Sequence, residues 1–217
     1  MKVYFFSGLG ANRRAFKNIK LSSDFEPVYI DWNMPENGES MDHYVQRFAE
    51  EINVNEKFAL AGLSFGGIIV RELNNYLNPE KTILISSIQN RGQMPAYMKL
   101  SSRTSAHKAI PIRFFTSKHL LSYTFFRKMY SSKMPDMNEF FTFNDPHYLK
   151  WSIHQIVNWK PKNEEINGLY QMHGDNDLIF PHKYVQPKAD IVKGGTHIMV
   201  LQKPKEVSKL LHQYLSE

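Results

Sequence analysis

The chain has 217 residues, of which 42% are hydrophobic and 22% charged, a composition typical of one soluble globular domain. It has no cysteine, which excludes disulfides, thiolate metal sites and a cysteine nucleophile. The formal net charge of +6 is compatible with anionic partners. The N-terminal apolar run breaks at Ser7-Gly8 and no other run approaches spanning length, so we expect a cytoplasmic protein without a transmembrane segment.

Six short segments rich in β-branched and aromatic residues predict buried strands. They are Lys2–Phe6, Pro27–Asp31, Lys57–Gly62, Lys81–Ser86, Gly168–Gly174 and Ala189–Gly195. Their apolar runs lack strict alternation, which is typical of strands covered on both faces, as in parallel sheets. We therefore expect a sheet of about six mainly parallel strands.

Helical spacing of apolar residues appears between these strands. Ser40–Ile52 has a serine at the N-cap position, Phe65–Leu77 stops before Asn78-Pro79, and Pro204–Leu215 opens on a proline. Alternating strands and helices predict the α/β class with flanking helices. We expect a single domain over residues 1–217.

The alternation stops over approximately residues 89–162, where prolines divide several short helical segments. Because the strand pattern resumes at Gly168, we interpret this region as a helical insertion between two strands. It forms a cap over the sheet in this interpretation, and it is not a separate domain.

The segment "GLSFG" places Ser64 between a predicted strand and a predicted helix. This G-x-S-x-G arrangement is typical of a nucleophile elbow, in which a tight turn exposes the serine hydroxyl. Gly62 and Gly66 remove the Cβ atoms that would collide in such a turn. A glycine-rich turn with an incidental serine is the alternative.

A serine nucleophile needs a general base and an orienting carboxylate, in the chain order serine, acid, histidine for this elbow. Asp175 and Asp177 follow the fifth predicted strand, and His197 follows the sixth. All would leave the carboxyl ends of strands, at the sheet edge that carries Ser64.

These motifs resemble the α/β-hydrolase superfamily over nearly the whole chain, as a small esterase-like or thioesterase-like member with a helical cap. The resemblance rests on "GLSFG", "HGDNDLIFP", "GGTH" and "FFSGLGANRRAF". It implies Ser64, Asp177 and His197 as the catalytic residues and the backbone N–H groups of Leu9 and Phe65 as the oxyanion hole. Asp175 is then a turn residue that binds backbone N–H groups. Ser7-Gly8 replaces the His-Gly of many relatives, which leaves a backbone donor intact.

Hydrolysis of an ester or thioester through an acyl-enzyme is the function that these residues predict, and it needs no cofactor. The same scaffold also supports carbon–carbon bond hydrolases, lyases and acyltransferases, and a slow-turnover binding protein is a further alternative. No histidine set has metal-ligand spacing, and no phosphate-binding or dinucleotide motif occurs, so we expect no metal and no nucleic-acid partner.

The insertion is rich in aromatic residues, and we expect some of them, such as Phe114, Phe125 and Phe126, to line a substrate pocket. No acidic residue occurs between Glu80 and Asp136, whereas ten lysines and arginines do. This stretch is either a solvated basic face or a surface for an anionic or carrier-bound substrate or an anionic membrane.

Overall fold

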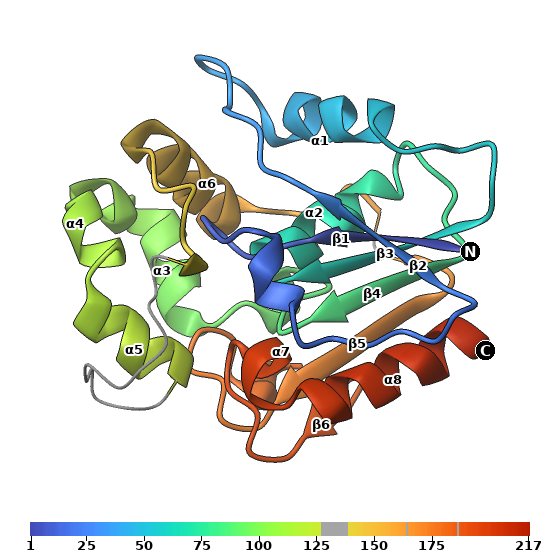
Figure 1. Cartoon of the computed structure of the whole chain (residues 1–217). Helices are drawn as coiled ribbons and strands as arrows, with labels where there is room; N and C mark the ends of the chain where they lie inside the picture. Colours follow the sequence, from blue (N-terminus) through green and yellow to red (C-terminus); the bar gives the residue numbers. More distant parts are fainter. Residues whose placement is uncertain (127–138, 164, 186) are drawn as a thin grey trace.

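The computed structural model describes residues 1–126, 139–163, 165–185 and 187–217. Its centre is a six-stranded sheet in the order β2-β1-β3-β4-β5-β6, and all neighbouring strands are parallel (Figure 1). This confirms the predicted fold class. The strands are β1 (Lys2–Phe6), β2 (Glu26–Ile30), β3 (Phe58–Leu63), β4 (Lys81–Ile85), β5 (Leu169–Gly174) and β6 (Asp190–Val192).

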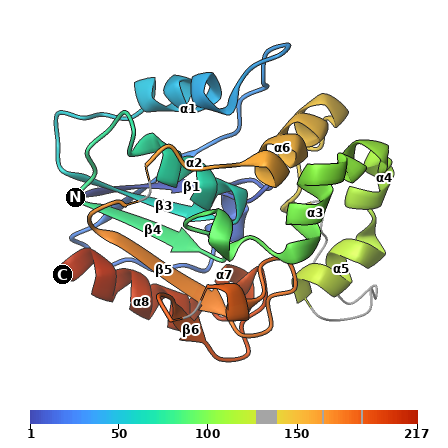
Figure 2. The ribbon, with the colours of Figure 1, turned by 180° about the vertical axis from the view of Figure 1, so that it is seen from behind.

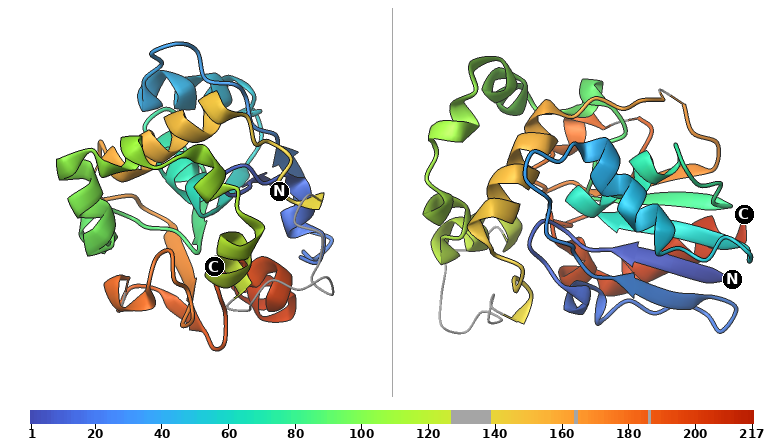
Figure 3. Two further views of the ribbon diagram at one scale, coloured as in Figure 1. Left: turned by 90° about the vertical axis from the view of Figure 1, so that its left-hand side faces the viewer. Right: turned by 90° about the horizontal axis from the view of Figure 1, so that it is seen from above.

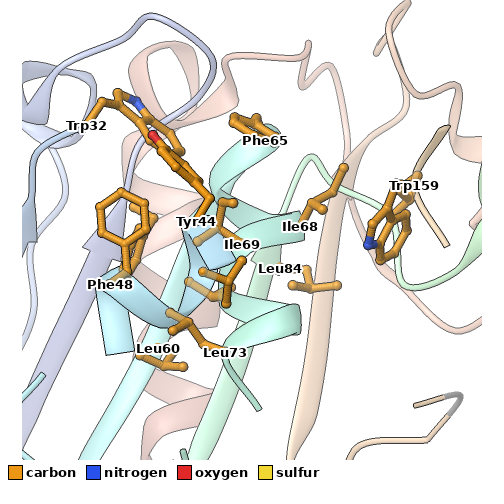
Figure 4. Close-up of a cluster of buried hydrophobic side chains, with 14 of the residues drawn as sticks. Trp32, Tyr44, Phe48, Leu60, Phe65, Ile68, Ile69, Leu73, Leu84 and Trp159 are labelled. Atoms are coloured by element: carbon orange, nitrogen blue, oxygen red, sulfur yellow. The ribbon is translucent and has the colours of Figure 1, made fainter. Parts of the chain in front are cut away.

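Helices cover both faces of the sheet (Figures 1 and 2). Helices α1 (Met41–Glu50) and α2 (Phe65–Leu73) lie on one face, while η1 (Arg13–Phe16), α7 (Met199–Gln202) and α8 (Pro204–Ser216) lie on the other. Side chains alternate between the two layers along each strand. In β1, Tyr4 and Phe6 belong to the core under α1 and α2, and Val3 and Phe5 to the core under α8. Figure 4 shows the first of these cores.

The helix ends follow from local hydrogen bonding. Ser40 caps α1 as predicted, because its Oγ accepts from the His43 N–H at 3.1 Å. Helix α2 ends at Leu73 and not at the predicted Leu77. The Asn74 side chain donates to the Val70 carbonyl at 2.8 Å, and the N–H groups of Asn75 and Tyr76 bond three residues back in a tighter turn.

The segment between β4 and β5 holds the helices predicted for the insertion. They are η2 (Arg91–Gln93), α3 (Ala96–Thr104), η3 (Ala106–Ala109), α4 (Ile112–Phe115), α5 (Lys118–Phe126) and α6 (Pro146–Asn158), and η5 (His182–Tyr184) follows after β5. These insertion helices gather beyond the carboxyl ends of the strands, with α4 and α5 outermost (Figure 3). Within the described ranges, no helix combines the length and apolarity needed to cross a membrane.

Arg71 of α2 holds both stems of this insertion. Its Nε donates to the Gln89 carbonyl at 2.5 Å, and its Nη2 donates to the Asn163 carbonyl. The side chain is 1% exposed and pairs with Glu72 at 3.2 Å. Trp159, at the end of α6, donates its indole N–H to the same Glu72 carboxylate at 3.0 Å. The insertion is therefore anchored on the helix that follows Ser64.

Candidate active site

Ser64 lies in a strained turn between β3 and α2. Its φ of 54° and ψ of −116° place it in a region that residues with a side chain rarely adopt. Two neighbours hold this conformation. The Ser64 N–H donates to the Ile85 carbonyl at 2.9 Å, and the Ser87 hydroxyl donates to the Ser64 carbonyl at 2.7 Å. The end of β4 thus stabilises the turn after β3.

The two flanking glycines are required by close backbone approach. A Cβ atom on Gly62 would lie 2.2 Å from the Gly66 carbonyl oxygen. A Cβ atom on Gly66 would lie 2.3 Å from the Phe6 carbonyl oxygen. Both distances are far shorter than any ordinary contact. The steric interpretation of G-x-S-x-G is therefore confirmed.

Ser64, His197 and Asp177 form a continuous chain of hydrogen bonds. The Oγ of Ser64 lies 2.8 Å from Nε2 of His197, and Nδ1 of His197 lies 2.8 Å from Oδ2 of Asp177. With the proton on Nδ1, the imidazole donates to Asp177 and its Nε2 accepts from the serine hydroxyl. The arrangement allows His197 to take the Ser64 proton.

Asp177 is 3% exposed, and its environment favours the ionised form. Burial alone would raise the pKa of this carboxyl group, but the charge interaction with His197 and hydrogen bonds from His173 and His197 lower the pKa below its ordinary value. The backbone N–H groups of Ile179 and Phe180 also donate to Oδ1, at 2.8 and 3.0 Å. A fixed carboxylate therefore faces the imidazole.

The two aspartates of the loop after β5 have separate partners. Asp175 accepts a hydrogen bond from the Gly194 N–H at 2.7 Å, which links this loop to the loop after β6. His173 donates its Nε2–H to the Phe180 carbonyl at 2.5 Å, and the same atom lies 3.2 Å from Asp177. Asp175 thus has the backbone-binding contact expected of it, and Asp177 is the aspartate next to His197.

The loop after β1 lies against Ser64. A Cβ atom on Gly8 would lie 3.5 Å from the Ser64 Cβ, and both Leu9 and Ser64 line the same pocket. Within the described part of the chain, the N–H groups of Leu9 and Phe65 donate no hydrogen bond. Phe65 opens α2, so its N–H belongs to the positive end of that helix.

Trp32, which the sequence reasoning missed, contacts both of these segments. Its indole N–H donates to the Gly8 carbonyl at 3.1 Å, and the Ala11 N–H donates to the same oxygen at 2.9 Å. Its ring stacks on Phe65 with centroids 5.2 Å apart and planes at 18° (Figure 4). Its position directly after the second predicted strand, at the sheet edge of Ser64, is the signal that was available.

A cavity of about 630 Å³ opens over Ser64 and His197 and extends under the insertion. Its wall is mostly apolar, and its described lining residues include no Asp, Glu, Lys or Arg. The polar side chains besides Ser64 and His197 are few: Tyr97, Ser101, Thr104, His107, Thr116, Thr124 and Asn144. This size is ordinary for a small-molecule site.

Aromatic residues of the insertion differ in their relation to this pocket. Phe140, Phe141 and Phe143 line it. Phe114 is 52% exposed and is not among the described lining residues, so its part in substrate binding stays a prediction. Ile112 packs against the core, and a position two residues later on a helix points roughly the opposite way. The side chains of Phe125 and Phe126 lie outside the described part.

One group of possible metal ligands was not anticipated. Side-chain ligand atoms of Glu36, Glu39 and His43 lie within 4.8 Å of one another. Glu39 already pairs with His43 at 2.7 Å and with Arg47 at 3.0 Å. Glu39 thus belongs to an ion-pair network with two residues of α1, and none of the three possible ligands lines the pocket.

No protein-family model and no curated protein matches the sequence. Solved structures match its fold. A thermophilic esterase from Thermogutta terrifontis has a TM-score of 0.74 at 14% identity, covering 100% of this chain and 89% of that one. A hydrolase from Pseudomonas aeruginosa has a TM-score of 0.74 at 13% identity, covering 100% of this chain and 90% of that one. ClbQ from the colibactin pathway has a TM-score of 0.66 at 13% identity, covering 99% of this chain and 96% of that one. The chain has the α/β-hydrolase fold.

Proposed function

We propose that the protein is a serine hydrolase that cleaves an ester or thioester with an apolar chain. The observation that carries this proposal is the chain of two 2.8 Å hydrogen bonds from Ser64 through His197 to Asp177. These bonds lie at the N-terminus of helix α2 and at the wall of an apolar cavity. The esterase, hydrolase and ClbQ neighbours agree with the proposal at the level of the fold.

The proposed reaction begins when the Ser64 oxygen attacks the carbonyl carbon while His197 takes the serine proton at Nε2. Asp177 keeps the imidazole oriented and stabilises its charged form. The carbonyl oxygen becomes an oxyanion held by the N–H groups of Leu9 and Phe65. The protonated His197 then gives its proton to the departing alcohol or thiol, which leaves an acyl-enzyme.

Water completes the cycle by the same route. The water oxygen attacks the acyl carbon while His197 takes a proton from the water. His197 then gives this proton to the Ser64 oxygen as that oxygen leaves the acyl carbon. The products are the free acid and the regenerated serine. The reaction needs no cofactor.

We assign Trp32 to positioning the oxyanion hole. The C=O of Gly8 and the N–H of Leu9 belong to one peptide unit, in which the two bonds point in opposite directions. Fixing the Gly8 carbonyl through the indole and through Ala11 therefore aims the Leu9 N–H away from Trp32. The ring stacked on Phe65 places the second donor relative to the first.

The test is labelling and turnover of the purified protein. A fluorophosphonate probe should attach to Ser64, and chromogenic esters of increasing chain length should be hydrolysed with kcat/KM rising as the cavity fills. Ser64→Ala should abolish labelling and lower kcat by a factor on the order of 10⁴ to 10⁶. Labelling that persists in Ser64→Ala would overturn the assignment.

Ser86→Ala is a matched control, because Ser86 also has a positive φ, of 47°, and follows the neighbouring strand β4. Its hydroxyl is buried without a hydrogen-bond partner in the described part, so its loss should leave labelling unchanged. Carbon–carbon hydrolase, lyase or acyltransferase activity would appear as probe labelling without ester turnover. A binding protein would show ligand-dependent rises in Tm without turnover.

A further inference from the structure

The mouth of the active-site pocket has an apolar rim. Of the seven large apolar side chains that are strongly exposed in the described part, five belong to the segment between β4 and β5. Three of these also line the pocket: Tyr97 is 53% exposed, Leu100 61% and Ile110 37%. A side chain that both lines a cavity and meets solvent lies at its opening.

Helix α3 provides much of this rim. Tyr97, Leu100, Ser101 and Thr104 all line the pocket, at the spacing of one helical face. None of the residues of α3 is fully buried. This helix face therefore exposes the large side chains of Tyr97 and Leu100 beside the cavity, and exposed apolar groups that gather in this way mark contact sites.

Basic residues flank the rim residues Leu100 and Ile110 in the sequence. Arg103, Lys108 and Arg113 are exposed, and none of them forms an ion pair with another described residue. No acidic residue occurs in the sequence from Lys81 to Pro135. The cavity wall itself has no charged residue among its described members. The basic residues are thus exposed neighbours in sequence of the rim residues Leu100 and Ile110, while the pocket wall suits an uncharged chain.

We propose that this face docks on an anionic lipid surface with the pocket mouth toward the bilayer. The rim side chains enter the acyl-chain boundary, while the basic residues contact headgroup phosphates. A chain that carries the ester then passes from the bilayer into the cavity without crossing water. Exposed apolar residues favour a lipid over an acidic protein, because charge pairing alone would leave Leu100 and Ile110 in water.

The experiment is cosedimentation of the full chain with vesicles of phosphatidylcholine alone or of phosphatidylcholine with phosphatidylglycerol. We expect binding to the mixed vesicles that weakens with salt, because added salt screens the headgroup charge. Arg103→Glu/Lys108→Glu/Arg113→Glu should reduce binding at least about tenfold, since each basic residue near an anionic surface contributes measurably. Leu100→Ser/Ile110→Ser should also reduce binding to the mixed vesicles, including at low salt.

The matched control is Lys20→Glu/Lys205→Glu/Lys209→Glu, which reverses three exposed lysines outside the insertion. Each triple variant changes three charges by two units and takes the formal net charge from +6 to zero. The control should bind the mixed vesicles like the wild type. An equal loss in both variants would show a nonspecific charge effect and overturn the docking face.

Two further measurements separate this inference from the proposed function on which its substrate route rests. Ser64→Ala should still bind the mixed vesicles, so docking is measured even if no ester is hydrolysed. The variant Arg103→Glu/Lys108→Glu/Arg113→Glu should keep wild-type turnover of a water-soluble ester. It should lose turnover of the same ester when that ester is presented in mixed vesicles. Equal binding to both vesicle types, or capture only by an immobilised acidic acyl carrier protein, would contradict docking on anionic lipid.

Discussion

The indole N–H of Trp32 donates to the carbonyl of Gly8, 24 residues earlier in the chain. Because Gly8 lies beside Ser64 and the Trp32 ring stacks on Phe65, a single buried side chain links the strand end after β2 to both proposed oxyanion donors. Its contribution to catalysis can be separated from its contribution to packing.

Trp32→Phe keeps an aromatic ring on Phe65 but removes the indole donor. We expect kcat to fall about tenfold with little change in KM, because a misaimed oxyanion donor weakens only the transition state. Inhibition by a trifluoromethyl ketone, whose adduct carries an oxyanion, should weaken in parallel. Trp151→Phe is the control: its indole N–H also binds a buried carbonyl, that of Glu39, at 2.8 Å. If both variants lose the same activity, Trp32 acts through general packing.

The two aspartates after β5 should respond differently to the same substitution. Asp177→Asn should lower kcat by about 10⁴, because an amide holds the wrong imidazole tautomer. Asp175→Asn should keep near-normal turnover and cost about 1 kcal/mol of unfolding free energy through its weakened bond to the Gly194 N–H. Steady-state kinetics and urea unfolding measure the two effects, and the reverse pattern would show that the acid is Asp175.

The lowered pKa of Asp177 predicts how stability depends on pH. Ionised Asp177 favours the folded state, so its contribution is complete above the unfolded value of about 3.9 and is lost as the pH falls through the lower folded pKa. The difference in Tm between wild type and Asp177→Asn should therefore shrink on acidification below about pH 4. Ser64→Ala keeps the Asp177 carboxylate, so its Tm should depend on pH in the same way as that of the wild type. A constant difference over this range would mean that Asp177 is not stabilised as an anion.

Gly66→Ala should destabilise the fold by about 3 kcal/mol or more, because the new Cβ would meet backbone oxygen of the β1 strand end. Gly38→Ala is the comparison. Gly38 has a φ of 74°, but a Cβ added there would have no neighbouring atom within 4 Å, so only backbone strain of about 1 kcal/mol is expected. Thermal unfolding of both variants tests whether close approach, and not conformation alone, requires the glycine.

The sheet and the elbow could be predicted because their signals are local. A buried strand that runs into G-x-S-x-G specifies its own turn, and loops at one sheet edge bring an aspartate and His197 to Ser64. The choice of Asp177 over Asp175 came from the resemblance to the α/β-hydrolase superfamily. The sequence places Trp32 at the sheet edge of Ser64, but its bond to Gly8 could not be predicted, since that bond joins segments that only the sheet order brings together. The pocket wall could not be predicted in detail either, because short helices with few buried residues have no strong periodic signal.

Arg71 holds Gln89 and Asn163 from one guanidinium group, so the chain leaves and re-enters the sheet domain at a single anchored point. The two parts of the segment between those residues differ in how they are held. Helix α6 belongs to the core of the sheet layer, since Tyr148 and Trp151 pack there with α1 and α2, whereas α3, α4 and α5 give that core only the partly buried Met98 and Ile112. Sequence changes in these outer helices should therefore alter substrate preference while the reaction centre keeps its place.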